Sequence, residues 1–349
     1  MPATRAPSAR LRPAWRCGDG RFCRLWYQLA SVCFYRRTRE FFPSENNSYT
    51  HINSMRNSRG ETCSPRDPLH GNLLSNFMAI MKTPISYYGG KQSMLKHILP
   101  LIPPHQLYTE AFCGGAAVLF AKRPAEAEVI NDLNMELTNF YWCAKMYFQD
   151  LKREIERTLH SRDVHAHAAH INAHPQFFTP VERAWAVWAL CKMSFASMLD
   201  GTFGYDFSGA MPEKVRNAKL DFTERLCRRL EHVTLECRNA LDVIACYDKP
   251  ETFHFVDPPY VNSDCGHYEG VFSEQNLEQL LQLLETVKGR FMLTMYPFPS
   301  IETHARKNGW RIHAVQRTIS VAKSNRRRQE EWIVCNYEPT EQTTLFGAI

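Results

Sequence analysis

Short apolar runs, separated by segments of helical period, organise the chain from about residue 83 onward. Each run is bounded by polar or turn-forming residues, as is typical of buried strands. Between the runs, apolar residues recur every three or four positions, which is typical of helices that cover a sheet. The expected strands are Leu107–Ala111, Glu128–Ile130, Val233–Cys237, Phe253–Val256, Phe291–Tyr296, Trp310–Val315 and Glu331–Tyr337.

Helical segments are expected between these strands. Residues 160–235 are mostly helical in pattern, and Val181–Leu199 is the clearest case. Ser273 is expected to cap a helix at its N-terminus. The apolar face of that helix comprises Leu277, Leu280, Leu281, Leu284 and Val287. The other expected helices are Met94–Leu101, Ala116–Lys122 and Leu133–Leu159. This alternation predicts an α/β fold, in which helices cover both faces of one sheet and a helical region is inserted into it.

The first 77 residues differ in composition from the rest. They contain 12 Arg, no Lys and 5 acidic residues, so their net charge is 12 − 5 = +7. The whole chain has a net charge of +6, which leaves 6 − 7 = −1 for the remainder. A basic arm that binds nucleic acid is one interpretation, but the lack of any sustained period favours a disordered tail or a non-native upstream extension. The nearly neutral body implies that any contact with nucleic acid depends on a local basic face.

Bulk composition places the chain among globular proteins, with 44% hydrophobic and 22% charged residues. No apolar stretch reaches the roughly 18 residues that a membrane span requires. The 12 cysteines are scattered, without CxxC pairs or nearby histidines at metal-ligand spacing. They are interpreted as reduced cytosolic thiols, and no metal site is expected.

The most informative motif is Asp257–Tyr260, or DPPY, directly after the expected strand Phe253–Val256. An acidic residue at the carboxyl end of a strand can point into the ligand crevice of an open α/β sheet. The two prolines lack N–H donors, so carbonyl groups there remain free to accept hydrogen bonds. Tyr260 offers a flat ring for stacking. The motif therefore suits an aromatic amine, although as a bare string it also occurs in ordinary turns.

A second motif is the glycine-containing loop at Glu110–Val118, where an expected strand turns into a helix. Paired glycines let the backbone approach a ligand closely. Asp132 lies 132 − 114 = 18 residues after Gly114 and ends the next strand, about where nucleotide-binding sheets place a carboxylate for ribose hydroxyls. The chain has no GxxxxGK[ST] motif, which disfavours an NTPase.

A third motif, Ser86–Lys91, contains the sequence YGGK just ahead of an expected helix. Its glycines permit a tight turn, which is also its plainest interpretation. Tyr87 can stack on an adenine or pack against a sulfonium, and Lys91 can pair with a carboxylate.

Together and in this order, these motifs resemble those of the Dam-like, D12 class of adenine-specific DNA methyltransferases. The resemblance extends from about Thr83 to Tyr337. It also includes Asn131-Asp132-x-Asn134 and the closing Glu331-x-x-x-x-Asn336-Tyr337. It implies a Rossmann-like methyltransferase sheet that uses S-adenosylmethionine and double-stranded DNA. The implied catalytic parts are residues 78–144 and 233–337. Residues 145–232 would form a helical target-recognition insert, and residues 338–349 a flexible tail.

The resemblance also assigns roles to residues. It implies that Asp257 and the Pro258 carbonyl hold the target N6 amine while Tyr260 stacks on the flipped base. The residues implied to bind the cofactor are Tyr87, Lys91, Phe112, Gly114, Asp132, Asn239 and Asp257. One departure is Asn239, where the family often has Asp, and this puts cofactor affinity in more doubt than activity, because Asn can still hydrogen-bond an adenine edge.

The chemistry follows from the amine itself. The target base must leave the duplex, at a cost of about a few kcal/mol. Its exocyclic nitrogen is a poor nucleophile, because the lone pair is delocalised into the ring. Hydrogen bonds to Asp257 and to the Pro258 carbonyl favour a more tetrahedral nitrogen, so positioning and electrostatics can support direct in-line transfer.

Four further features have ordinary interpretations beside functional ones. Five histidines between His160 and His174 suggest a metal site, but a solvated helix face is the better interpretation. The basic run Lys323–Arg328 is either a solvated turn or a phosphate contact. The loop Asp200–Gly209 either packs or enters a DNA groove. The tail Gln342–Phe346 looks like a peptide that binds a bacterial sliding clamp, but a mobile end is the better interpretation.

Two rival functions remain. Cytosine N4 methylation uses the same amine chemistry, but related sites often carry Ser where this chain has Asp257. A DNA-binding relative without catalysis is disfavoured by the intact Lys91, Asp132 and Asp257. The favoured function implies a cytoplasmic enzyme of bacterial or phage origin, of the kind found in restriction–modification systems.

Overall fold

The structure is a computed structural model that describes residues 81–261, 272–318 and 328–339. The chain divides into two units, Met1–His70 and Gly71–Ile349. The first unit lies outside the described residues, as do the expected tail at 1–77, the basic run up to residue 327 and the clamp-like peptide Gln342–Phe346. In the second unit, none of the described helices is long and apolar enough to cross a membrane.

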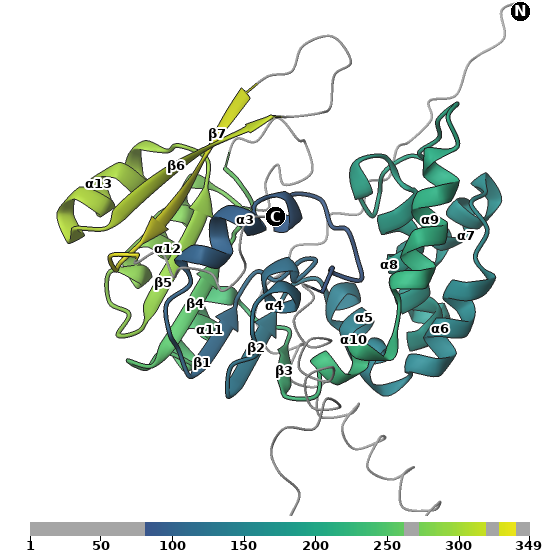
Figure 1. Ribbon diagram of the computed structural model, residues 1–349, viewed down its shortest axis with the longest axis horizontal. Helices are drawn as coiled ribbons and strands as arrows, with labels where there is room; N and C mark the ends of the chain where they lie inside the picture. Colours follow the sequence, from purple (N-terminus) through teal and green to yellow (C-terminus); the bar gives the residue numbers. More distant parts are fainter. Residues whose placement is uncertain (1–80, 262–271, 319–327, 340–349) are drawn as a thin grey trace, which may run out of the picture. The chain divides into compact units, whose positions relative to one another are not determined.

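A seven-stranded sheet forms the centre of this unit, with the strand order β3-β2-β1-β4-β5-β7-β6 (Figure 1). The strands are β1 Leu107–Glu110, β2 Ala127–Asn131, β3 Val233–Glu236, β4 Thr252–Val256, β5 Arg290–Met295, β6 Arg311–Thr318 and β7 Arg328–Cys335. The first five are parallel, and β7 runs antiparallel to both of its neighbours. The strand order reverses between β1 and β4, where ligand crevices form in such sheets. This confirms the expected Rossmann-like fold.

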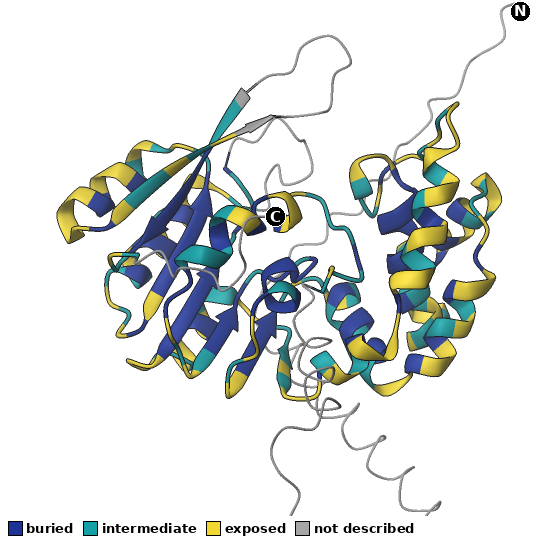
Figure 2. Ribbon diagram, in the orientation of Figure 1, coloured by how far each residue is buried: buried dark blue, intermediate teal, exposed yellow. Residues whose placement is uncertain are grey.

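Helices cover both faces of the sheet, so nearly every residue of the central strands β1, β4 and β5 is buried (Figure 2). In β4, Phe253 and Phe255 pack into one hydrophobic cluster, whereas Val256 packs into the other. The first cluster includes residues of α3 Leu95–Ile98 and α4 Ala117–Ala121. The second includes residues of α11 Ala240–Cys246, α12 Glu274–Leu284 and α13 Pro299–Asn308. Ser273 caps α12 as expected, through a reciprocal pair of bonds with Asn276.

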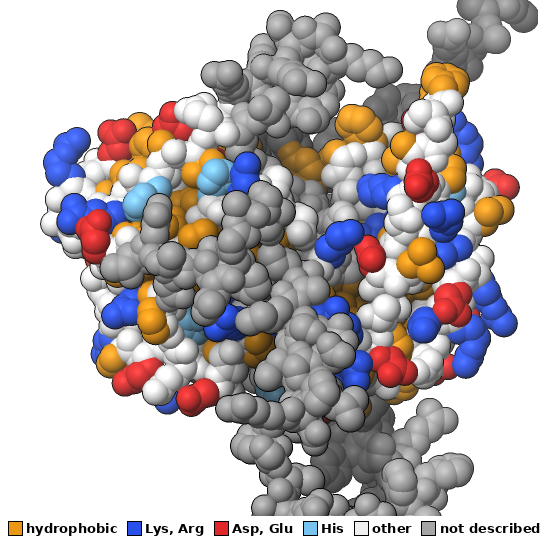
Figure 3. Space-filling view, viewed as in Figure 1, with side chains coloured by type: hydrophobic (Ala, Val, Ile, Leu, Met, Phe, Trp, Pro, Cys, Tyr) orange, Lys and Arg blue, Asp and Glu red, His pale blue; other side chains and the backbone are white. Residues whose placement is uncertain are grey.

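The chain between β2 and β3 is helical, as expected. It forms α5 Met135–Met146, α6 Phe148–Arg157, α7 Arg162–Ala173, α8 Pro180–Met193, α9 Ala210–Asp221 and α10 Glu224–Arg229. Helix α8 packs against α5, α6, α7 and α9, so nearly every residue from Ala184 to Met193 is buried. Basic and acidic side chains alternate over this helical part on the face drawn in Figure 3.

Three expected helix boundaries were wrong. The helix expected over Leu133–Leu159 breaks at Tyr147, whose backbone leaves the helical region at φ −125° and ψ 37°. The helix expected to reach Leu199 ends at Met193, because Ser194 is extended and Ala196 and Ser197 have positive φ. The helix expected over Met94–Leu101 is α-helical only at Leu95–Ile98 and has 3-10 turns at Lys91–Ser93 and Leu99–Leu101. Pro100 lacks the N–H group that an α-helical turn would use there.

A buried ion cluster joins the sheet to α10. The Glu128 carboxylate at the start of β2 pairs with Lys122 at 2.6 Å and with Arg229 of α10. Arg229 also donates to the Leu119 carbonyl at 2.7 Å. Burial raises the pKa of Glu128, but its interactions with Arg229 and Lys122 lower that pKa by more than burial raises it. The pKa of Glu128 is therefore below its usual value.

We expect Arg229→Ala to lower the free energy of unfolding by about 3 kcal/mol, because it removes one partner of a buried carboxylate. Urea unfolding at pH 7 measures this loss. Arg228→Ala is the matched control, since Arg228 is exposed on the same helix and its loss should cost less than about 0.5 kcal/mol. Equal losses in the two variants would contradict a stabilising role for the cluster.

Candidate functional site

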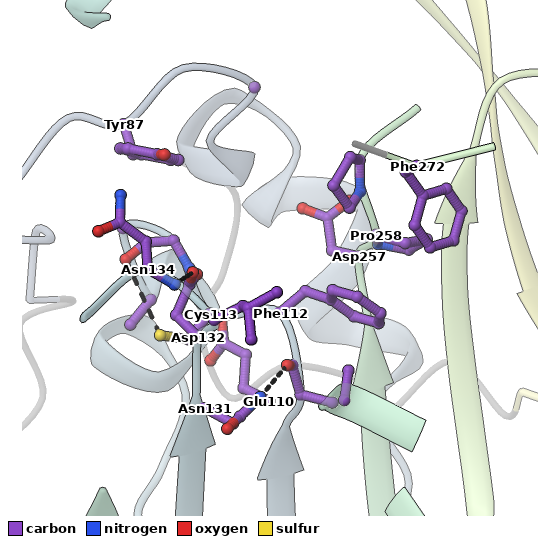
Figure 4. Close-up of a pocket in the computed structure, with 18 of the residues that line it drawn as sticks. Tyr87, Glu110, Phe112, Cys113, Asn131, Asp132, Asn134, Asp257, Pro258 and Phe272 are labelled. Atoms are coloured by element: carbon purple, nitrogen blue, oxygen red, sulfur yellow. Dashed lines mark hydrogen bonds between the residues drawn. The ribbon is translucent and has the colours of Figure 1, made fainter. Parts of the chain in front are cut away.

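A cavity of about 550 Å³ opens at the carboxyl ends of β1, β2 and β4. Five segments line most of it, at residues 87–91, 110–117, 131–134, 238–241 and 257–260. Every residue that the sequence assigned to catalysis or cofactor binding lies in this lining: Tyr87, Lys91, Phe112, Gly114, Asp132, Asn239, Asp257, Pro258 and Tyr260. Figure 4 shows Tyr87 on one side of the cavity and Asp257 with Pro258 on the other. The fold therefore brings together three motifs that are far apart in the sequence.

The glycine loop after β1 lies against Tyr87. Gly114 has a φ of +46°, and a Cβ atom there would lie 3.0 Å from Tyr87 Cδ1. Its N–H donates to Asp132 Oδ2 at 2.9 Å, and its carbonyl accepts from the Tyr141 hydroxyl at 2.7 Å. A side chain at this position would both strain the backbone and collide with the ring, so glycine is required.

Asp132 is held by main-chain donors at the end of β2. Its Oδ2 atom accepts from Gly114, and its Oδ1 atom accepts from Asn134 N at 2.9 Å. Burial raises the pKa of Asp132, while these two bonds oppose the rise. Each carboxylate oxygen can accept a second hydrogen bond, so Asp132 retains acceptors for a ligand.

Lys91 and Asp257 form a buried ion pair on the opposite wall. The Lys91 Nζ atom lies 2.7 Å from Asp257 Oδ2 and 3.7 Å from Glu331 Oε1, and its side chain is only 4% exposed. It also donates to the Gly89 carbonyl at 3.0 Å. Thr294 of β5 donates to Asp257 Oδ1 at 2.7 Å. Burial raises the pKa of Asp257 above its usual value, although Lys91 and Thr294 oppose that rise.

Tyr260 is fixed at both ends of its ring. Its hydroxyl donates to Glu331 Oε1 at 2.7 Å, and its ring meets Tyr296 edge-on at 4.3 Å between centroids. Burial and the neighbouring carboxylates place the pKa of Tyr260 well above its usual value, so the hydroxyl keeps its proton and remains a donor. The ring orientation is therefore set before any ligand arrives.

Sequence reasoning missed Glu110, Thr294 and Tyr141, and it noted Glu331 only as part of a closing motif. Glu110 was detectable, because it ends β1 directly before the glycine loop, as Asp257 follows β4 directly before its prolines. Thr294, Tyr141 and Glu331 act through contacts between distant elements, which no local motif reveals.

Asn239 begins α11 as its N-cap. Its Oδ1 atom accepts from Leu241 N at 2.9 Å, which leaves the amide nitrogen as its other polar atom. Since an amide nitrogen only donates, Asn239 offers the cavity a donor group that a carboxylate in its place would lack.

Two candidate features lie apart from this cavity. Of the five histidines, His165 is buried against Ser194 at 3.0 Å, whereas His167, His170 and His174 are not buried. Over the described ranges, no group of three or more His, Cys, Asp or Glu residues is arranged to hold a metal ion.

The loop Asp200–Gly209 is partly packed and partly exposed. Phe203 stacks on His160 at 4.7 Å between ring centroids, while Tyr205 and Phe207 are exposed. The loop therefore packs through Phe203, and entry of its exposed rings into a DNA groove stays a prediction.

The family model for D12 class N6 adenine-specific DNA methyltransferases matches residues 87–338. The chain is 24% identical over 240 residues to modification methylase StsI of Streptococcus sanguinis, covering 62% of this chain and 35% of that protein. It is 39% identical over 71 residues to type II methyltransferase M1.LlaDCHI of Lactococcus lactis subsp. cremoris, covering 20% of this chain and 25% of that protein. The chain thus spans about a third or less of the length of these relatives.

Among solved structures, an rRNA methylase from Streptococcus thermophilus is 9% identical, with a TM-score of 0.26 over 70% of this chain and 92% of that one. The architecture of this chain rests on the order and direction of its own strands.

A double-mutant cycle tests the ion pair. We expect Lys91→Met to lower the free energy of unfolding by about 3–5 kcal/mol, because it leaves buried carboxylates without their ammonium. Combined with Asp257→Asn, the loss should be smaller than the sum of the single losses by about 1–3 kcal/mol. Urea unfolding of the parent and the three variants measures this coupling. Lys96→Met, at an exposed position of α3, is the matched control, and strict additivity within the cycle would refute the coupling.

Proposed function

Because the chain belongs to the D12 class of N6 adenine-specific DNA methyltransferases, we propose that it transfers a methyl group from S-adenosylmethionine to the N6 amine of adenine in double-stranded DNA. The observation that carries this proposal is the meeting of DPPY, the glycine loop and YGGK around one cavity. The relatives are named as modification methylases or type II methyltransferases, so we place this activity in a restriction–modification setting within the bacterial or phage-infected cytoplasm.

The lining fits such a cofactor. S-adenosylmethionine supplies an activated methyl group on a positively charged sulfur. Gly114 has no side chain, which allows close approach to the loop backbone, and Tyr87 lies beside it as a stacking surface. Asp132 has acceptors for ribose hydroxyls, and Asn239 has a donor for an adenine edge. Phe112 and the Lys91–Asp257 pair complete the lining that we assign to the cofactor.

Asp257, Pro258 and Tyr260 form the part that we assign to the target base. A carboxylate oxygen of Asp257 and the Pro258 carbonyl would accept the two amine hydrogens, which localises the nitrogen lone pair. Tyr260 would stack on the extruded adenine, and its ring is already oriented by Glu331. The Lys91 ammonium opposes the rise in the pKa of Asp257 that burial causes, which favours the carboxylate form as an acceptor.

We assign target recognition to the helical insert at residues 145–232 and catalysis to residues 78–144 and 233–337. Two further contacts stay predictions: that of the basic run Lys323–Arg328 with phosphates, and that of Gln342–Phe346 with a sliding clamp. Nearly all of these residues lie outside the described ranges.

The activity is tested by incubating the purified chain with DNA and labelled S-adenosylmethionine and analysing the nucleosides by mass spectrometry. We expect N6-methyladenine from the parent protein. We expect the methylation rate of Asp257→Asn to fall by at least about 10²-fold, because an amide has only one acceptor oxygen and carries no negative charge. Glu302→Gln makes the same acid-to-amide change at an exposed position of α13 and should keep full activity. N4-methylcytosine, or no labelled DNA from any variant, would defeat the proposal.

The departure at residue 239 has a measurable consequence. In Asn239→Asp, one carboxylate oxygen keeps the cap on α11 and the second becomes an acceptor for the adenine amino group. We expect S-adenosylmethionine to bind more tightly by about 1 kcal/mol, or roughly fivefold in Kd. Isothermal titration calorimetry measures this gain. The control is Asn172→Asp on α7, outside the cavity lining, and weaker binding by Asn239→Asp would show that residue 239 does not meet that amino group.

A further inference from the structure

Glu110 is a buried carboxyl group in the cavity lining that the proposed chemistry leaves without a role. It is 3% exposed. Its Oε2 atom accepts from the Tyr108 hydroxyl at 3.0 Å and from Leu119 N at 3.1 Å. Within the described part of the chain, no hydrogen bond reaches Oε1.

The second oxygen of Glu110 is open to the cavity. Among the described residues, three side-chain atoms are inaccessible to solvent and have no hydrogen-bond partner. They are Trp188 Nε1, Arg229 Nε and His313 Nε2. Glu110 Oε1 has no hydrogen bond but does not belong to that group, and Glu110 lines the cavity. An unpaired acceptor on a buried carboxyl group therefore faces the ligand space.

The cations around Glu110 are already paired with other carboxylates. Lys91 is paired with Asp257, and Lys122 is paired with Glu128. Asp257 adds a second negative charge nearby. Burial raises the pKa of Glu110 to about 8; the charge on Asp257 adds to the rise, whereas the bonds from Tyr108 and Leu119 and the charge on Lys122 oppose it. At pH 7 the free protein therefore holds Glu110 mostly protonated.

We propose that Glu110 selects for positive charge on the methyl donor: it gives up its proton when a sulfonium cofactor binds and takes one back when that cofactor becomes a neutral thioether. This inference rests on the function proposed above. It assigns to Glu110 a role in distinguishing donor from product.

The charge change comes from the reaction itself. Transfer breaks the bond between sulfur and methyl carbon and forms one between nitrogen and that carbon. Sulfur keeps the electron pair and loses its positive charge, and the amine nitrogen releases a proton to solvent. A carboxylate that was stabilised by the sulfonium loses that stabilisation, so Glu110 binds a proton from solvent and its attraction for the product falls.

Calorimetric titration of the full chain with S-adenosylmethionine and with S-adenosylhomocysteine, each at pH 6.0 and 8.5, tests the proposal. Titration at pH 7 in two buffers of different ionisation enthalpy counts the protons released. We expect parent protein to release roughly 0.5 more protons than Glu110→Gln when the donor binds. At pH 8.5 we expect Glu110→Gln to bind the donor about tenfold more weakly than parent protein does. At pH 6.0 the donor Kd values of the two proteins should differ by less than about threefold. The product Kd should change less than about threefold at either pH.

Glu236→Gln is the matched control. Glu236 also accepts from a tyrosine hydroxyl, that of Tyr247 at 2.8 Å, but it lies outside the cavity lining. Comparing each variant with parent cancels proton release by the donor's own amino group. Equal proton release in parent and Glu110→Gln, or equal weakening of donor and product, would overturn the role of Glu110 alone. Failure of the parent to bind the donor at all would overturn the proposed function as well.

Discussion

The buried ammonium group of Lys91 is the contact on which the active end of the sheet depends. It pairs with Asp257 after β4, approaches Glu331 of β7 at 3.7 Å and lies 4.9 Å from the centre of the Tyr260 ring. Two carboxylates enclosed this deeply would otherwise repel each other and favour protonation. One cation therefore lets Asp257 remain an acceptor and lets Glu331 hold the Tyr260 hydroxyl.

The same contact explains why the motifs are separated so widely in the sequence. Residues 91, 257 and 331 belong to the segment before β1, the end of β4 and the antiparallel strand β7. They meet because β4 lies beside β1 and β5, and β7 lies beside β5. The wall of the cavity that carries Lys91, Asp257 and Tyr260 therefore depends on the correct order of these strands in the sheet.

Sequence patterns predicted the seven strands and the residues of the cavity because both leave local signals. Strand ends carry acids, and glycines mark places where a ligand approaches. The break at Tyr147 and the early end of α8 have no such signal. The break at Tyr147 lets α6 pack against α8. Helix α8 ends at Met193 because the backbone of Ser194 is extended. Thr294 and Tyr141 also could not be predicted from local sequence, because each bonds to a residue that is distant in the sequence: Thr294 to Asp257 and Tyr141 to Gly114.

The helical insert and the cofactor side of the cavity support each other. Lys192 of α8, within the insert, donates to the Ser86 hydroxyl at 3.1 Å, next to Tyr87. Lys192 is 5% exposed, so this contact is enclosed between the helices and the loop. Tyr141 of α5, just before the insert, holds the Gly114 carbonyl, and α8 packs against α5. Both helices therefore hold the two segments that meet at Gly114 and Tyr87. A displacement of α8 would move Ser86 directly and the glycine loop through α5, so the region assigned to target recognition is mechanically joined to the region assigned to the cofactor.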